Sequence, residues 1–430
     1  MKKLFAASLL LAASSAVACP NGLTSLGEHN GVERCELKGT YLSSTVRLTS
    51  QYEYIINGGV FIGDDNSNSS KLVIEPGVVV RGLPGSFISI MRGSKIEAVG
   101  TADQPIRFTS IKETGRKRGE WGGLVLNGNA PINACKITGS SVCEAMSEGI
   151  KEREVKFGGA NPQDNSGILK YVIVEYVGYP IAPDNELNGI TFNGVGSDTE
   201  VDYIQVHMSS DDGIEFFGGT VNAKHVVLSG NEDDSMDWDF GWNGKMQFVL
   251  INQGSDKVDN GIEADNLASP MNATPRSNPI ISNMTLLGSA QSSYGMLLRR
   301  GTGAQLSNVI VSGFSKACID IDDAETFKNA AINQNGVLQA TGLTMQHSIL
   351  SCNKPFENEN GDLFATQDWY AAQAGNLVTN PLLTGWMPET NSPALGNGTM
   401  LEDFFFEPVD YIGAFGSDDW TQGWIVDSIN

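Results

Sequence analysis

The residues with the most chemistry to offer are acids gathered in one short stretch of the chain. The segment 232–244, EDDSMDWDFGWNG, holds five carboxylates interleaved with four large apolar side chains. Carboxylates at this density can bind a hard cation, and a pair of them can serve as general acid and base. The third interpretation is a solvated face on an acidic protein. The elements that carry these acids decide among the three.

The acidic segment is one unit of a repeat. Its units begin at Gly189, Gly213, Ser235, Gly261, Gly295 and Cys318, in steps of 22 to 26 residues with one of 34. A second series of apolar stretches lies between them, such as 201–209 and 223–230. Two short strands in each period of about 22–25 residues are typical of a solenoid. The leucine-rich consensus is missing, so the pattern favours an all-β fold, a parallel β-helix.

Strand alternation sorts the acidic units into inward and outward positions. The expected inward residues are Ile214, Phe216, Met236, Trp238, Phe240, Ile262 and Ala264. One outward column is Thr191, Glu215, Asp237, Glu263, Leu297 and Asp320, and its neighbour is Asn193, Phe217, Asp239, Asp265, Arg299 and Asp322. The preceding turns add Asp211, Asp212, Asp233, Asp234, Asp259 and Asn260. We therefore expect an acidic ladder over three consecutive coils.

The negative charge of such a ladder must be compensated by positive charge. Repulsion between like charges one strand apart costs roughly 1 kcal/mol per pair in water and several-fold more near a protein surface. Calcium would supply the positive charge, although neither an EF-hand loop nor a calcium-binding nonapeptide repeat is present. The candidate calcium ligands are Asp211, Asp212, Glu215, Asp233, Asp234, Asp237 and Asp239. Arg299 is expected to form an ion pair at one end of the ladder.

A catalytic interpretation uses the same face. Its candidates are Asp211, Asp212 and Asp237, with Arg299 as the base of a lyase-type reaction. Two aromatic residues, Phe217 and Trp242, are placed where a ring could stack on a sugar. The remaining aromatic residues of the unit are expected in the core.

Charge and the N-terminal sequence bear on location and partners. A formal net charge of −22 argues against binding nucleic acid, whose phosphates it would repel. Residues 1–18 resemble a signal peptide: Lys2 and Lys3 precede an apolar run, and Ala16-Val17-Ala18 forms a cleavage site. No later apolar run approaches the ~20 residues that span a bilayer. We expect an exported protein, extracellular, at the cell surface or in the periplasm, and not membrane-spanning.

Six cysteines fall into pairs by their position in the chain. The expected disulfides are Cys19–Cys35, Cys135–Cys143 and Cys318–Cys352, since an even set in an exported protein favours pairing. A lipid on Cys19, next to the cleavage site, is the alternative, and it would leave one cysteine unpaired.

The repeat pattern also gives domain boundaries. Residues 19–50 are expected to form an N-terminal cap, 51–352 the parallel β-helix, and 353–430 a C-terminal capping region whose aromatic segment 404–424 could cover the last coil. The pattern lapses at about 129–166, which predicts a loop inserted in one coil and stapled by Cys135–Cys143.

Several phrases resemble those of a known group of proteins. IEPGVVVRG, RGSKIEAVGTADQPIRFTS, GEWGGLVLNGNAPIN and DYIGAFGSDDWTQGW are similar to sequences of exported bacterial right-handed β-helix proteins of the pectin-lyase-like superfamily. The resemblance implies a right-handed β-helix and export. SSDDGIE, at 209–215, resembles the paired-aspartate motif of polygalacturonase-like hydrolases and maps it onto Asp211 and Asp212, but the GHG and RIK triplets of that family do not occur.

Two functions of different classes follow from the sequence. The first is a non-catalytic secreted or cell-surface protein that binds a polysaccharide or matrix component through an acidic, calcium-loaded face. The second is a polysaccharide lyase or glycoside hydrolase that acts on acidic polysaccharides through that face. The incomplete catalytic pattern favours the first.

Overall fold

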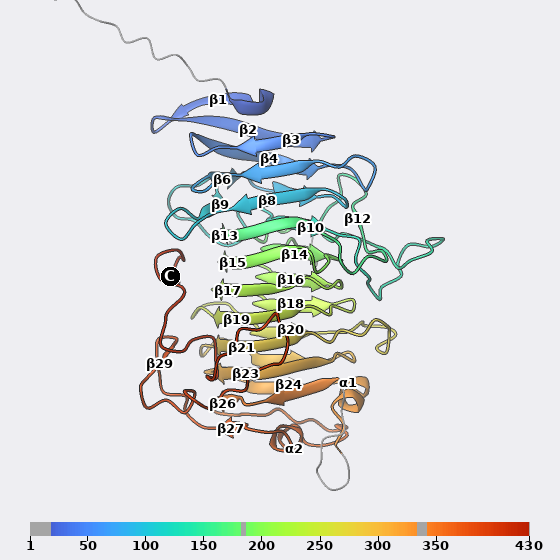
Figure 1. Ribbon diagram of the computed structural model, residues 1–430, viewed down its shortest axis with the longest axis vertical. Helices are drawn as coiled ribbons and strands as arrows, with labels where there is room; N and C mark the ends of the chain where they lie inside the picture. The colour runs from blue at the N-terminus through green and yellow to red at the C-terminus, as the bar shows by residue number, and fades with distance from the viewer. Residues whose placement is uncertain (1–18, 182–185, 333–341, 430) are drawn as a thin grey trace, which may run out of the picture.

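The computed structural model describes residues 19–181, 186–332 and 342–429, so the predicted signal peptide at 1–18 lies outside the described residues. Within these ranges, 25 strands pair into one continuous sheet. The strands stack along the long axis of the molecule, from the N-terminal coils at one end to α1 and α2 at the other (Figure 1). The predicted parallel β-helix is confirmed.

Three parallel stacks of strands form the faces of the coil. The first, which we call the ladder sheet, consists of β7 (Phe87–Ile90), β10 (Leu124–Asn127), β14 (Ile190–Asn193), β16 (Ile214–Phe217), β18 (Met236–Asp239), β20 (Ile262–Ala264), β22 (Tyr294–Leu298) and β24 (Ala317–Ile321). The other two share the long strands β13 (Gly167–Glu175), β15 (Glu200–His207), β17 (Ala223–Ser229), β19 (Lys245–Asn252), β21 (Ile280–Leu287) and β23 (Ala304–Ser312).

Each long strand bends at one residue, and the bend divides it between two faces. The N-terminal half of β13 pairs with β8, whereas its C-terminal half pairs with β9. The bend residues have left-handed backbone conformations with φ between 48° and 61°; they are Tyr171, Tyr203, His225, Phe248, Asn283 and Asn308. Because they recur once per coil, their side chains form a column, in which Tyr171 and Tyr203 stack at 4.4 Å.

The first coils precede these long strands. They contain η1 (Pro20–Gly22), β1 (Thr24–His29), β2 (Val32–Tyr41), β3 (Thr45–Leu48), β4 (Tyr52–Ile62), β5 (Lys71–Ile74), β6 (Val79–Gly82), β8 (Lys95–Val99) and β9 (Ile106–Ser110). β1 pairs antiparallel with β2, while β2 pairs in parallel with β4. The region 19–50, predicted to be a cap, therefore contributes strands to the stack itself.

An inserted loop leaves the coil between β10 and β13. It carries the short strands β11 (Ala145–Met146) and β12 (Lys156–Phe157), which pair antiparallel. Ile132, Ala145 and Phe157 of this loop pack against Phe217 at the end of β16. The loop therefore lies at the C-terminal ends of the ladder-sheet strands, on the side where β12 projects in Figure 1.

The last coil and the C-terminal chain complete the fold. Their elements are α1 (Ala324–Asn329), β25 (Leu343–Gln346), β26 (Ile349–Ser351), α2 (Thr366–Ala371), β27 (Leu377–Val378), β28 (Leu383–Thr384) and β29 (Met387–Pro388). Trp369 and Tyr370 of α2 are buried against the core. No helix in the described ranges is long and apolar enough to cross a membrane.

Residues 399–429, which we call the C-terminal strap, return along the side of the coils (Figure 1). Their backbone hydrogen-bonds to side-chain amides of the long strands. The Gln205 amide donates to the Val426 carbonyl at 2.7 Å and accepts from the Val426 N–H at 2.8 Å. The Gln247 amide does the same with Glu407, at 2.9 and 2.7 Å. The aromatic segment expected over the last coil therefore lies along the flank instead.

The three disulfides join the predicted partners. Cys19–Cys35 ties the N-terminal residues to β2, Cys135–Cys143 closes a turn of the inserted loop, and Cys318–Cys352 links β24 to the residue after β26. The disulfide prediction is confirmed, and Cys19 is engaged with Cys35 in the structure.

Candidate functional site

Three consecutive coils place acids on the outer surface of the ladder sheet. The register sets Glu215 of β16 opposite Asp237 of β18, and Asp237 opposite Glu263 of β20. Thr191 precedes this run and Leu297 follows it. Since neighbouring strands lie about 4.8 Å apart, the three carboxylates share one narrow column. The order of this column is the one that strand alternation predicts.

The turns before these strands add carboxylates, and the structure gathers the acids into three groups. Within each group the candidate ligand oxygens lie within 4.8 Å of one another. The groups are Asp211–Asp212–Asp233, Asp212–Glu215–Asp237 and Asp233–Asp234–Asp259. Six of the seven predicted calcium ligands belong to them; Asp239 does not, and Asp259 was not among those predicted. We call Asp212, Glu215 and Asp237 the central group.

Two aspartates in these turns have hydrogen bonds that explain their position. Asp212 Oδ1 accepts from the backbone N–H of Asp234 at 3.0 Å, and Asp234 Oδ1 accepts from that of Asn260 at 2.9 Å. Each therefore ties its own turn to the turn of the next coil. This pairing repeats along the stack and fixes the spacing of the acidic turns.

The two outward-facing acids of the central group, Glu215 and Asp237, have few hydrogen-bond partners. Glu215 accepts a hydrogen bond from Asn188 Nδ2. Asp237 Oδ1 is buried, and it has no hydrogen-bond partner among the described residues. A buried carboxylate oxygen without a partner costs about 1–3 kcal/mol or more, so this atom is a position where a cation would be stabilising.

Burial and mutual repulsion dominate the electrostatics of the site. Burial, followed by repulsion from neighbouring carboxylates, raises the pKa of Asp212, Glu215 and Asp237 well above the usual range. Burial and the nearby Asp233 raise the pKa of Asp211 to about 7. At neutral pH these groups must therefore share protons or take up positive charge from solution.

Basic side chains compensate only one end of the ladder. Arg299 donates to Glu263 and, through Nε at 3.0 Å, to Asp265, while Arg300 donates to Asp265 at 2.8 Å. Arg299 thus forms the ion pairs within the ladder that its position in the sequence suggests, and it is not a free base. Within the described ranges, no lysine or arginine forms an ion pair with a member of the central group.

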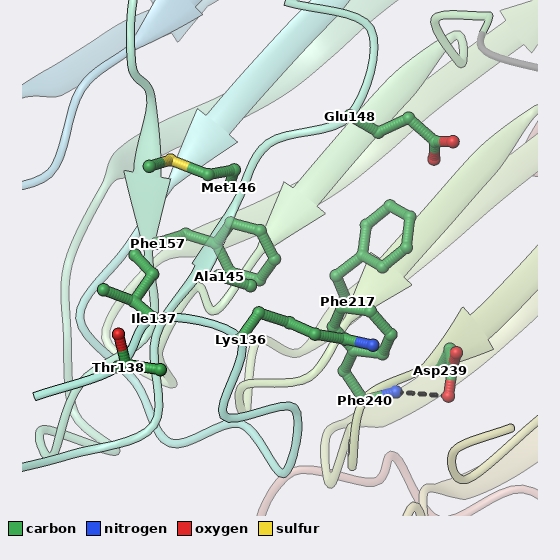
Figure 2. A pocket seen from close by; sticks show the side chains of 10 residues that line it. All are labelled: Lys136, Ile137, Thr138, Ala145, Met146, Glu148, Phe157, Phe217, Asp239 and Phe240. Carbon is green, nitrogen blue, oxygen red and sulfur yellow. Dashed lines mark hydrogen bonds between the residues drawn. The ribbon is translucent and has the colours of Figure 1, made fainter. Parts of the chain in front are cut away.

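A pocket of about 730 Å³ adjoins the ladder where the inserted loop meets the ends of β16 and β18. Its lining residues are Lys136, Ile137, Thr138, Ala145, Met146, Glu148, Phe157, Phe217, Asp239 and Phe240. Figure 2 shows the Lys136 side chain reaching from the loop toward the Phe217 and Phe240 rings, with the Glu148 and Asp239 carboxylates on either side of Phe217. Phe217 thus lines this pocket, with 8% of the residue exposed.

Two aromatic residues lie in places other than those expected from the sequence. Trp242 is completely buried, stacks on Phe216 at 3.9 Å and donates to the carbonyl of Val221 at 3.2 Å, so its ring offers no face to a ligand. Phe240, expected inside, instead lines the pocket and packs 5.2 Å from Phe217. Phe240 directly follows the last residue of β18 and has a left-handed backbone with a φ of 54°, so strand alternation no longer predicts where its side chain lies.

Comparison with known proteins assigns the fold to a family. Residues 39–425 match the model of the pectate-lyase-like β-helix domain. The chain belongs to the pectate-lyase-like β-helix family. No curated protein matches it. Among solved structures it is similar to the crystal structure of the periplasmic alginate epimerase AlgG, with 10% identity, a TM-score of 0.28, and coverage of 81% of this chain and 84% of that one.

In this pectate-lyase-like β-helix protein, several residues at the site escape sequence reasoning. Asn188, Lys136 and Glu148 lie in loops whose folded position no periodicity fixes. The available signal was the lapse of the repeat at 129–166, which marks an insertion but does not indicate the face that it covers. The combined arrangement places carboxylate oxygens, the ligand type that suits hard cations, beside a partly aromatic pocket.

Proposed function

We propose that this β-helix protein binds calcium at the acidic ladder and, through the loaded face, an acidic polysaccharide at the cell surface or in the surrounding matrix, without cleaving it. The observation that carries the proposal is the central group. Three carboxylates have ligand oxygens within 4.8 Å of one another, and Asp237 Oδ1 is buried with no hydrogen-bond partner in the described part of the chain. A cation would satisfy that atom and relieve the repulsion together.

The ligand chemistry favours calcium over other divalent ions. The gathered groups are all carboxylates, which suit hard cations, and they contain neither histidine nor cysteine. Carboxylates from strands and turns of successive coils form an irregular set, which calcium tolerates with its six to eight ligands better than magnesium with its strict octahedron. A calcium ion with open positions can also bind the carboxylates of an anionic glycan.

The geometry supports binding better than catalysis. A lyase-type reaction needs a free base, yet Arg299 is held by Glu263 and Asp265. Export is supported by three disulfides, because such bonds persist in oxidising compartments. The acidic surface itself would repel an anionic glycan, so we expect glycan binding to require the cation.

Thermal unfolding with and without calcium tests the cation site. Calcium at 100 times its dissociation constant would stabilise the native state by about 2.7 kcal/mol, so the melting temperature should rise with calcium and fall with EDTA. Asp237→Asn should abolish most of that rise, whereas Asp103→Asn, at an exposed position away from the ladder, should retain it. Identical melting curves of the wild type in calcium and EDTA would exclude the site.

Retention on immobilised polygalacturonate and alginate tests the glycan. We expect retention in calcium, release by EDTA, and neither reducing ends nor unsaturated products after prolonged incubation. Product formation that Asp212→Asn or Asp237→Asn removes would establish the alternative, a lyase or hydrolase. Absence of retention on every acidic glycan, with calcium binding intact, would restrict the ladder to a structural cation site.

A further inference from the structure

The pocket between the inserted loop and the ladder sheet contains features that a cation site does not need. It is lined largely by apolar side chains, and its charged groups come from two separate parts of the chain. We infer that this pocket binds a neutral pyranose ring of a glycan, independently of any cation on the ladder. This inference does not rest on the proposed calcium function.

The aromatic lining provides a platform for a sugar ring. Phe217 is 8% exposed and Phe240 is half-buried, with their ring centres 5.2 Å apart. Phe157 of β12 lies behind both, at 6.2 and 6.4 Å. The two outer rings therefore present apolar surface to the pocket, and the C–H face of a pyranose is the kind of surface that such rings bury.

The polar lining matches hydroxyl groups. Lys136 is a donor, while the carboxylates of Asp239 and Glu148 are acceptors (Figure 2). Asp239 Oδ1 accepts from the backbone N–H of Phe240 at 2.6 Å, which fixes the carboxylate at the rim and leaves its second oxygen for a ligand. A few convergent donors and acceptors above apolar walls are typical of small-molecule sites.

Charge selects against ionic ligands. The Lys136 ammonium already lies 5.9 Å from the centre of the Phe240 ring, the position that a ligand cation would take. In their ionised forms, the two carboxyl groups that line the pocket repel an anion such as a uronate. A neutral polyol meets neither obstacle, because its hydroxyls can both donate to Asp239 and accept from Lys136.

The loop that supplies Lys136 is anchored before any ligand arrives. Cys135–Cys143 closes the turn, and the Lys136 backbone N–H donates to the Glu144 carbonyl at 2.9 Å. Asn133 N–H donates to the Phe240 carbonyl at 2.9 Å and joins the loop to the ladder sheet. A preorganised pocket loses less conformational entropy on binding.

Titration calorimetry in EDTA tests this inference, with cellotetraose, xylotetraose, mannotetraose and galactotetraose as probes. We expect at least one to bind, and Phe217→Ala to weaken it at least tenfold. Lys136→Gln, at an exposed position that leaves the fold intact, should weaken it several-fold, and Phe404→Ala, a fully exposed ring elsewhere, should have no effect.

Binding of none of the four probes would overturn the inference. So would tetragalacturonate or chitosan tetramer binding more tightly than every neutral probe, or neutral binding that neither Phe217→Ala nor Lys136→Gln changes. Because EDTA removes the ladder's cations, the result is independent of the calcium experiments, and either proposal can fail while the other stands.

Discussion

Arg299 stabilises the acidic ladder through two contacts. It donates to both Glu263 and Asp265, and Asp265 is only 3% exposed. Arg300 also reaches Asp265, but no described residue other than Arg299 forms an ion pair with Glu263. Removing one partner from a buried ion pair costs about 3–5 kcal/mol, because the remaining charge is left without compensation.

Arg299→Met should therefore lower the free energy of unfolding by about 3 kcal/mol at pH 8 in EDTA. The loss should be smaller at pH 5, because burial raises the pKa of Glu263 to about 7 and the carboxyl is then protonated. Urea unfolding at the two pH values measures this. Lys257→Met removes an 83%-exposed partner of Glu232 and should change little, by analogy with other surface pairs. Equal losses for Arg299→Met at both pH values would contradict the argument.

Residue by residue, the sequence predicts the column of acids but not the residues around it. Period-two alternation is enough to place Glu215, Asp237 and Glu263 on one face in register, because successive side chains of a strand point to opposite faces of the sheet. It fails one residue beyond β18, where Phe240 has a left-handed backbone and lies at the pocket instead of in the core. Trp242, expected to meet a ligand because it lies near a turn, is buried. Nothing in the local residue types distinguishes these two aromatic positions.

At the scale of elements, the strap shows how the fold uses the bends of its long strands. The bends aim Tyr203 and His225 outward in a stacked column, 4.1 Å apart, and Trp420 and Trp424 of the strap pack edge-on against this column. The repeat predicts the coils because each unit resembles the last. The strap has no repeat, so its path depends on complementary contacts that become visible only in three dimensions.

Trp424 should contribute most of the strap's attachment. Its buried ring packs in one cluster with Ile173, Val227 and Leu250, so Trp424→Ala should cost about 3–5 kcal/mol. The readouts are urea unfolding and limited proteolysis within residues 399–429. Phe404→Ala is the matched control on the strap and should behave as wild type, since Phe404 is fully exposed. A Trp424→Ala protein with wild-type stability and protease resistance would show that the strap is held elsewhere.

At the scale of the whole molecule, stacking similar units also stacks their charges. A net charge of −22 is spread over the chain, but the solenoid concentrates part of it along one face. The turns cannot move apart, because Asp212 and Asp234 hydrogen-bond the next coil. The repeat that builds the core therefore enforces repulsion on its surface, and the stability of the molecule should depend on protons and cations.

That dependence has a definite sign. Burial raises the pKa of Asp211, Asp239, Glu263 and Asp320 to about 7, above the value near 4 in an unfolded chain, so the native state binds more protons and loses stability as pH rises toward 7 and beyond. His207 has the opposite effect on stability, since burial lowers its pKa to about 4. Below about pH 6.5 the unfolded chain takes up a proton at this residue while the native state does not, so stability rises with pH there.

Thermal unfolding in EDTA between pH 6.5 and 8.5 isolates the acids, because His207 is neutral there in both states. We expect the melting temperature to fall across this range, and calcium to reduce the fall, since a bound cation replaces the lost protons. Asp237→Asn removes one of the clustered charges and should flatten the EDTA curve. A melting temperature that rises with pH in EDTA would mean that the ladder is compensated by groups other than protons and cations.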